Sequence, residues 1–269
     1  MSVSPDAIPS SNLPRIDIHS GVLTSRKAIQ AVSQETKRET LLVGDGIRLY
    51  LESRTPASPK ATVIIVHGAG EHIGRYDEFI RILVSDGNMY YGYDQRGHGR
   101  SEGARGHIGR FQQYVGDLGT VVELANSSQD TPVFLFGHSM GALVSTIYCG
   151  CHQGKIEGLI LSGFPNRIRR SPFSLRMARA IARVAPRLQF SNGIRPTDLT
   201  KDTSEQMLYE SDELIHNTVT AQWVSEFDGA CSKALDLASR IRLPCLAIHG
   251  GADPLADPKG TGEIGRAHV

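Results

Sequence analysis

A serine between two glycines, Gly137-x-Ser139-x-Gly141, is the strongest candidate for chemistry in this sequence of 269 residues. An apolar run, residues 133–136, comes before it and an apolar segment with a helical pattern follows it. This order predicts a strand, a sharp turn and a helix, and such a turn exposes the serine hydroxyl while its glycines allow close strand–helix contact. We therefore predict that Ser139 is a nucleophile.

A serine hydroxyl is a weak nucleophile at neutral pH, so it needs a base, an orienting carboxylate and N–H donors for the developing oxyanion. The geometry of the turn aims the N–H of Met140 at the oxyanion. A second N–H can come from the loop His67-Gly68-Ala69-Gly70, and we assign it to Ala69 because its small neighbours let the backbone approach a substrate.

The orienting carboxylate is expected after a later strand of the same sheet. Asp253 lies in the turn that directly follows the apolar run 243–248, and we prefer it to Asp257 for that reason. Aspartates are common in turns for purely conformational reasons, so this assignment depends on the serine motif.

Apolar runs alternate with helical patterns through most of the chain. A hairpin is expected over residues 41–53, and strands are expected at 61–66, 89–93, 133–136, 156–161 and 243–248. This alternation predicts an α/β fold with a doubly wound, mostly parallel sheet. Ligands of such sheets bind beyond the carboxyl ends of the strands, where Ala69, Ser139 and Asp253 are all expected.

Residues 165–240 lack strand signals and predict a helical cap over the active edge of the sheet. Its first helix, 171–188, has two stripes at helical spacing. The apolar stripe consists of Phe173, Met177, Ile181, Val184 and Leu188. The basic stripe consists of Arg176, Arg179, Arg183 and Arg187. Either the apolar stripe packs on the domain and the arginines are solvated, or the helix lies on a membrane with its arginines at lipid phosphates.

The amino-acid composition limits which binding partners and which cellular compartment we expect for the protein. The balance of 29 Lys and Arg against 28 Asp and Glu argues against nucleic-acid binding. The 4 cysteines have no C-x-x-C spacing, so we expect free thiols, a reducing compartment, no metal site and no cofactor. No run is long enough to span a bilayer and no signal core is visible, so we expect a cytoplasmic protein, at most peripheral at membranes. Residues 1–40 are expected to be a disordered extension.

Four motifs in order give the sequence, over about residues 40 to 260, a specific resemblance to a known family. They are His67-Gly68-Ala69-Gly70-Glu71-His72 with Arg75-Tyr76, residues 94–103 (DQRGHGRSEG), Gly137-His138-Ser139-Met140-Gly141, and Gly251-Ala252-Asp253. The sequence resembles the α/β-hydrolase superfamily and, within it, the monoacylglycerol lipase-like group of lysophospholipases with a serine aminopeptidase S33-type domain. The resemblance implies the same roles for Ser139, Asp253, Ala69 and Met140.

By this resemblance the protein is expected to be a serine hydrolase that cleaves lipid esters, monoacylglycerol or lysophospholipid, through an acyl-enzyme. The apolar stripe of the cap favours a lipid acyl chain as part of the substrate. The alternatives are a peptidase or small-ester esterase on the same fold, or a non-catalytic ligand-binding member. A dehalogenase with an aspartate nucleophile is disfavoured because Ser139 occupies the turn.

The histidine of the catalytic triad is missing from this pattern. In the family it follows a further strand well beyond the acid, and only 16 residues follow Asp253. We do not assign the role to His268, and His249 at a strand end is interpreted as structural. The histidines of the loop motifs are expected to fix those loops: His67, His72 and His98.

We therefore expect the last strand and helix of the fold to be absent and the chain as written to be inactive. Residues 263–269 correspond to the translation of a common sequencing-adapter sequence, so we interpret them as a non-native tail behind a domain of residues 41–262. Without those elements, an apolar edge of the sheet is expected to be exposed.

Overall fold

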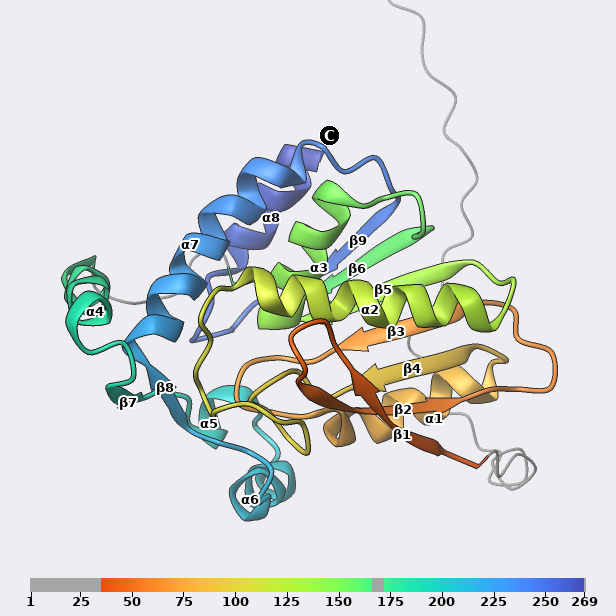
Figure 1. Ribbon diagram of the computed structural model, residues 1–269, viewed down its shortest axis with the longest axis horizontal. Coiled ribbons are helices and arrows are strands. Elements are labelled where there is room, and N and C mark those ends of the chain that lie inside the picture. Colours follow the sequence, from red (N-terminus) through yellow and green to blue (C-terminus); the bar gives the residue numbers. More distant parts are fainter. Residues whose placement is uncertain (1–34, 166–171, 269) are drawn as a thin grey trace, which may run out of the picture. The chain divides into compact units, whose positions relative to one another are not determined.

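The computed structural model of the protein describes residues 35–165 and 172–268 (Figure 1). The extension predicted for residues 1–40 lies mostly outside this part of the chain. Its last residues do not continue the extension, because strand β1 (Lys37–Leu42) already begins there.

Within the described residues, a sheet of seven strands in the order β1-β2-β4-β3-β5-β6-β9 forms the centre of the fold. The other strands are β2 (Arg48–Arg54), β3 (Thr62–Val66), β4 (Met89–Tyr93), β5 (Val133–His138), β6 (Gly158–Ser162) and β9 (Cys245–Ile248). The first two strands pair antiparallel, as does β2 with β4, and all further pairs are parallel. The predicted doubly wound, mostly parallel sheet is confirmed.

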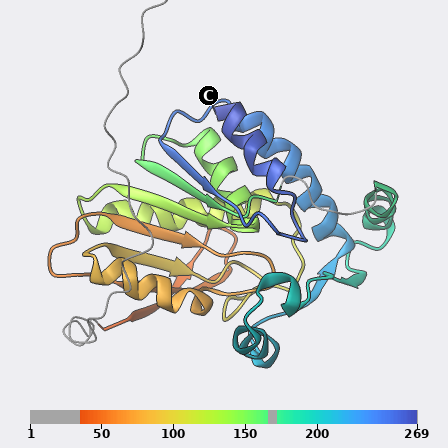
Figure 2. The ribbon, with the colours of Figure 1, turned by 180° about the vertical axis from the view of Figure 1, so that it is seen from behind.

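Helices cover both faces of this sheet because β3 is apolar on both of its sides. Val63 and Ile65 pack toward α1 (Asp77–Ser85), which follows the short helix η1 (Ile73–Tyr76). Ile64 and Val66 belong to the larger core under α2 (Gln112–Ser128), α3 (Met140–Cys151) and α7 (Ala221–Ala238). Figures 1 and 2 show α1 and α2 on opposite faces.

The segment predicted to be a helical cap, residues 165–240, is not purely helical where the structure describes it. It contains α4 (Pro172–Val184), α5 (Pro196–Leu199) and α6 (Thr203–Ser211), together with two short strands, β7 (Gln189–Ser191) and β8 (Thr218–Thr220). These strands pair antiparallel as a separate ribbon. The expectation of a cap without strands was wrong because three residues are too few to show an alternating pattern.

Helix α4 packs against α7 with a different face from the one that its large apolar residues suggested. Leu175 and Ala178 pack on the core beside α7. Four residues of the predicted apolar stripe are instead exposed to solvent: Phe173 (70%), Met177 (46%), Val184 (84%) and Leu188 (49%). The expectation that this stripe faces the domain is therefore wrong for these four residues.

The C-terminal part of the described chain forms helix α8 (Pro258–His268), which the sequence did not predict. Ile264 is buried at 2% exposure in the core that α7 also covers. At the edge of the sheet, β9 pairs with β6, and Leu246 and Ile248 are 57% and 45% exposed. Two apolar side chains of β9 are therefore exposed, and the absence of a further strand and helix stays a prediction. The interpretation of residues 263–269 as non-native stays a hypothesis.

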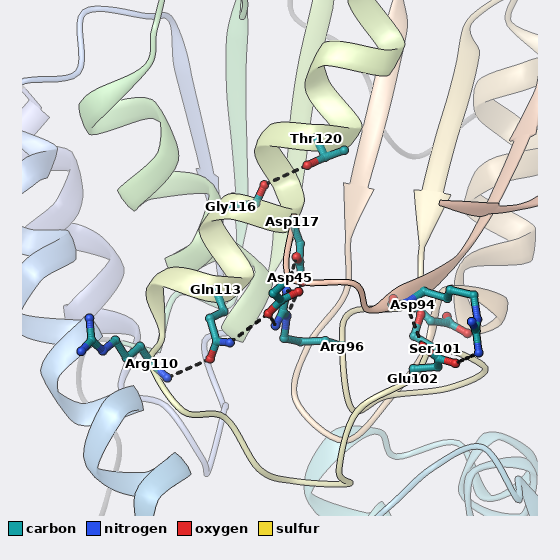
Figure 3. Close-up of polar contacts among 11 residues, drawn as sticks. Asp45, Asp94, Arg96, Ser101, Glu102, Arg110, Gln113, Gly116, Asp117 and Thr120 are labelled. Carbon is teal, nitrogen blue, oxygen red and sulfur yellow. Dashed lines mark hydrogen bonds and ion pairs between the residues drawn. The ribbon is translucent and has the colours of Figure 1, made fainter. Parts of the chain in front are cut away.

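A buried arginine joins three segments that are distant in the sequence (Figure 3). Arg96, in the loop after β4, donates two hydrogen bonds of 2.6 Å to Asp117 on α2. It donates two more, of 2.6 and 3.1 Å, to Asp45 in the turn between β1 and β2. Burial raises the pKa of the Asp117 carboxyl, and the bonds from Arg96 oppose that rise. The arginine therefore keeps a buried carboxylate compensated.

We predict that Arg96→Met lowers the free energy of unfolding at pH 7 by about 3–5 kcal/mol, because Asp117 loses its partner inside the protein. The matched control is Arg48→Met, whose exposed ion pair with Glu102 contributes less than about 1 kcal/mol. Urea unfolding of both variants at several pH values measures the difference.

The pH dependence identifies the cause of this loss. Without Arg96, the folded-state pKa of Asp117 lies further above its unfolded value, so protonation stabilises the folded variant. The deficit relative to the parent protein should therefore shrink as the pH falls through that raised pKa. A deficit that is the same at every pH would contradict the assignment of the loss to the Asp117 charge.

Candidate active site

The turn between β5 and α3 holds the predicted nucleophile in a strained backbone conformation. Ser139 has φ 50° and ψ −115°, and it is the non-glycine residue with a positive φ in the described part of the chain. Its N–H donates to the carbonyl of Ser162 (2.9 Å), and its carbonyl accepts from the N–H of Ala142 (2.9 Å). Strain of this kind costs about 1–3 kcal/mol and persists only where the surroundings impose it.

The two glycines of the motif are required by close backbone contacts. A Cβ atom at Gly141 would lie 2.0 Å from the carbonyl oxygen of Val66, the last residue of β3. A Cβ atom at Gly137 would lie 2.6 Å from the carbonyl oxygen of Gly141. Both distances are far below contact, so only glycine lets α3 begin this close to the sheet.

A cavity of about 570 Å³ opens at the carboxyl ends of the central strands, and it brings together three of the predicted residues: Ala69, Ser139 and Asp253. Residues of the cap, from Ile194 to Lys201 and Tyr209, form its other wall. The fourth predicted residue, Met140, is completely buried and would act only through its backbone N–H.

The loop that carries Ala69 lies directly against the serine. A Cβ atom at Gly68 would be 3.4 Å from Cβ of Ser139. Neither the N–H of Ala69 nor that of Met140 has an acceptor among the described residues. Two backbone donors next to a nucleophile are the arrangement that stabilises an oxyanion.

His67 anchors this loop and takes no part in the cavity. Its Nδ1–H donates to the carbonyl of Gly68 (2.7 Å), and its Nε2 accepts from the N–H of Gln95 (2.9 Å). Complete burial lowers the pKa of the imidazole, which is therefore neutral at pH 7. The predicted structural role of His67 agrees with these contacts.

Asp253 lines the cavity but is also fully engaged within its own turn. One oxygen, Oδ1, accepts from the N–H groups of Leu255 (2.8 Å) and Ala256 (3.0 Å), and Oδ2 accepts from Nε2 of His249 (3.0 Å). The rejected candidate, Asp257, accepts from the N–H of Lys259 at the start of α8 and is not part of the cavity wall. The geometry therefore favours Asp253 over Asp257.

The histidines of the described chain do not complete a triad. Both ring nitrogens of His249 are paired, the second with the Thr261 hydroxyl at 2.5 Å, and its side chain lies outside the cavity wall. His138 does line the cavity, but its Nδ1 pairs with the Ser162 hydroxyl at 3.1 Å. The side chain of His268 lies outside what the structure describes.

The other two motif histidines hold loops in place. His72 accepts from the N–H of Gly74 at Nδ1 (3.2 Å), so its Nε2–H donates to Asp212 of the cap (2.7 Å). His98 is buried and donates from Nδ1 to the carbonyl of Arg96 (3.0 Å). Structural roles agree with these contacts, as the sequence predicted.

Glu71 is a cavity residue to which the sequence analysis assigned no role, although it lies in a quoted motif. It accepts hydrogen bonds from the N–H of Gly68 and from the hydroxyl of Tyr76 (2.6 Å). Burial opposes the ionisation of the Glu71 carboxyl, but the neighbouring His138 and these hydrogen bonds outweigh burial and lower its pKa. A carboxylate is thereby held under the loop of Ala69.

Comparison with known proteins agrees with the fold and the serine turn, which together define an α/β-hydrolase. Residues 57–268 match the family model described as serine aminopeptidase, S33. The chain therefore belongs to this family. Its similarity within the family is to monoacylglycerol lipases.

Proteins from several organisms are similar to this chain in sequence. The chain is 34% identical to rat monoglyceride lipase over 226 residues, covering 82% of this chain and 74% of that one. It is 28% identical to the monoacylglycerol lipase of Mycolicibacterium smegmatis over 221 residues, covering 80% and 79%. It is also 32% identical to an uncharacterised abhydrolase domain-containing protein of Dictyostelium discoideum, of which it spans only 24%.

Two solved structures show the same fold. The monoacylglycerol lipase of Paleococcus ferrophilus has a TM-score of 0.74 at 30% identity, covering 81% of this chain and 84% of that one. A monoglyceride lipase variant from Saccharomyces cerevisiae, solved with a substrate analogue, has a TM-score of 0.77 at 22% identity, covering 89% and 84%. At that lower identity the second structure supports the fold alone.

We predict that Ser139→Gly is more stable than Ser139→Ala by about 1 kcal/mol, because glycine alone adopts the positive φ of this turn without strain. Both variants lack the hydroxyl, so the comparison isolates the backbone. Thermal unfolding of the two variants measures the difference. Equal midpoints would show that the turn stores no conformational strain.

Proposed function

We propose that the protein hydrolyses carboxylic esters of single-chain lipids, monoacylglycerol or lysophospholipid, through an acyl-enzyme on Ser139. The observation that carries this proposal is one cavity that holds a strained, partly buried serine beside the Ala69 loop and Asp253. Its volume of about 570 Å³ suits a small-molecule substrate. The names of the similar rat and bacterial lipases support the same class of substrate.

The proposed reaction follows from the positions of these groups. The Ser139 hydroxyl oxygen attacks the ester carbonyl, and the N–H groups of Ala69 and Met140 stabilise the oxyanion that forms. A histidine base takes the serine proton and returns it to the leaving alcohol, while Asp253 orients that histidine. Water then cleaves the acyl-enzyme in the same way. The described residues do not supply this base, and the inactivity of the 269-residue chain stays a prediction.

A peptidase on the same site is the second candidate, because the family description names an aminopeptidase. Recognition of a substrate amine would use a carboxylate that is free to pair with it. The three carboxylates of the cavity wall are each engaged in hydrogen bonds within the protein: Glu71, Asp198 and Asp253. This arrangement favours esters over peptides with a free amino group.

The cap supplies the basis for proposed contact with a membrane. No helix of the described chain is long and apolar enough to cross a membrane. We propose a cytoplasmic protein that binds membranes peripherally through the exposed apolar face of α4. Arg179 forms an ion pair with Asp228 of α7, whereas Arg183 on α4 and Arg187 after it are exposed. An apolar face with flanking cations is the composition of an interfacial helix.

A serine-directed fluorophosphonate probe is expected to label Ser139, slowly in the 269-residue chain because a base is missing from the described site. Ser139→Ala should abolish labelling without unfolding the protein. Ser162→Ala is the matched control, since it removes another hydroxyl of the cavity and should retain labelling. Labelling that survives Ser139→Ala would refute the assignment, and a panel of acyl esters and aminoacyl amides separates lipase from peptidase.

Sedimentation with vesicles tests the membrane contact. Replacing Met177, Val184 and Leu188 by Ser should reduce binding to anionic vesicles, because each exposed apolar side chain contributes about 1–3 kcal/mol when it is buried in lipid. Replacing all four arginines of the stripe by Gln should reduce it further at low salt. The control is Leu42→Ser, which changes an apolar residue exposed on β1. If the parent protein does not sediment with vesicles, the membrane proposal is wrong.

A further inference from the structure

The cap wall of the cavity carries a cation without a partner. Lys201 lies between α5 and α6 and lines the same cavity as Ser139. Its side chain forms no ion pair or hydrogen bond with any residue that the structure describes. A charge at the wall of a binding cavity is stabilised when an oppositely charged ligand group approaches it.

The acidic groups of the cavity wall are paired with other residues, and none of them contacts Lys201. Asp198 accepts two hydrogen bonds from the Arg195 side chain, of 2.9 and 2.7 Å. Asp253 is paired with His249. Glu71 is paired with Tyr76.

The second cation of the wall, Arg75, is in a different situation. It lies 4.0 Å from both Glu71 and Glu205, and its guanidinium stacks 5.0 Å from the ring centroid of Tyr209. Its charge is therefore partly balanced within the protein. Lys201 is the uncompensated cation of the described cavity wall.

The backbone on either side of Lys201 is held in a defined position. The N–H of Thr200 donates to the carbonyl of Pro196 (3.3 Å), and its carbonyl accepts from the side chain of Gln206 (2.8 Å). Asp202 caps α6 by accepting from the N–H of Ser204 (2.8 Å). The lysine is thus presented from an ordered turn of the cap.

Two residues of the same cap segment as Lys201 carry hydroxyl groups. Thr197 and Thr200 both line the cavity. The Thr200 hydroxyl accepts from the N–H of Asp202 (3.1 Å), which leaves its own O–H available as a donor. An ammonium group with neighbouring hydroxyl donors and no free carboxylate suits a ligand that only accepts hydrogen bonds, as a phosphate does.

We infer that Lys201, with the hydroxyls of Thr197 and Thr200, binds the phosphate of an anionic single-chain lipid. The cavity would then prefer a monoacylglycerol phosphate to a neutral monoacylglycerol. This inference rests on the proposed function, because it places the acyl ester at Ser139 and the headgroup at the cap wall. A neutral glycerol headgroup would leave the ammonium charge without a partner.

Binding of non-hydrolysable lipids to Ser139→Ala tests the inference without requiring catalysis. The probes are a 1-O-alkylglycerol and its 3-phosphate, used below their micelle concentrations in isothermal titration calorimetry. The phosphate should bind about fivefold more tightly in this background, and Lys201→Gln should abolish that difference. The preference should also weaken as the salt concentration rises.

The matched control is Lys155→Gln, because Lys155 is ion-paired with Glu123 and is not part of the cavity wall. It should leave the preference for phosphate unchanged. Equal affinities for the two lipids, or a preference that survives Lys201→Gln, would overturn the inference.

Inorganic phosphate and glycerol 3-phosphate form the last arm of the experiment. Both should bind far more weakly than the lipid phosphate, since they lack the acyl chain. If inorganic phosphate alone binds as tightly, the wall is a phosphate site unrelated to lipids and the inference is wrong. Loss of probe labelling at Ser139 would instead count against the proposed hydrolysis, so the two failures are distinguishable.

Discussion

The closeness of α3 to β3 is the constraint on which the candidate site depends. Gly141 faces the Val66 carbonyl at a distance that excludes any side chain, so the helix begins immediately beside the sheet. Ser139 takes its positive φ at this point of close approach, directly before the first residue of α3. The same contact brings the end of β3, and with it the Ala69 loop, next to the serine. The predicted nucleophile and the proposed oxyanion donors are therefore positioned by backbone packing.

The cap is attached to the same loop that carries the proposed oxyanion donor. His72 donates to Asp212 of the cap, and the N–H of His216 donates to the carbonyl of Gly70 at 3.0 Å. A Cβ atom at Gly70 would lie 2.6 Å from the His216 carbonyl oxygen, so this contact, like the one beneath α3, leaves no room for a side chain. A few short polar contacts therefore fix the position of the cap relative to the loop that carries Ala69. A shift of the cap would disturb the backbone beside Ser139.

Sequence reasoning succeeded where residue type is dictated by local geometry. The glycines around Ser139 could be predicted because the close backbone contacts there leave no room for a side chain. The role of Asp253 after β9 stays a prediction. Cap strands β7 and β8 could not be predicted, since three residues carry no period. The orientation of α4 was wrong for a related reason: Leu175 and Ala178 turn inward while larger residues such as Val184 stay exposed. The size of the apolar side chains of α4 alone did not reveal which face of this helix packs against α7.

Every hydrogen bond that shapes the nucleophile turn is made by the backbone of Ser139, and its hydroxyl contributes to none of them among the described residues. The fold thus specifies where the Cβ atom at this position points and leaves the attached chemical group unspecified. A thiol introduced by Ser139→Cys would stand in the same place and form a thioester in place of an ester. The backbone of this turn therefore fixes the position of the side chain at residue 139, and the reactive group that it carries can be changed without changing the fold.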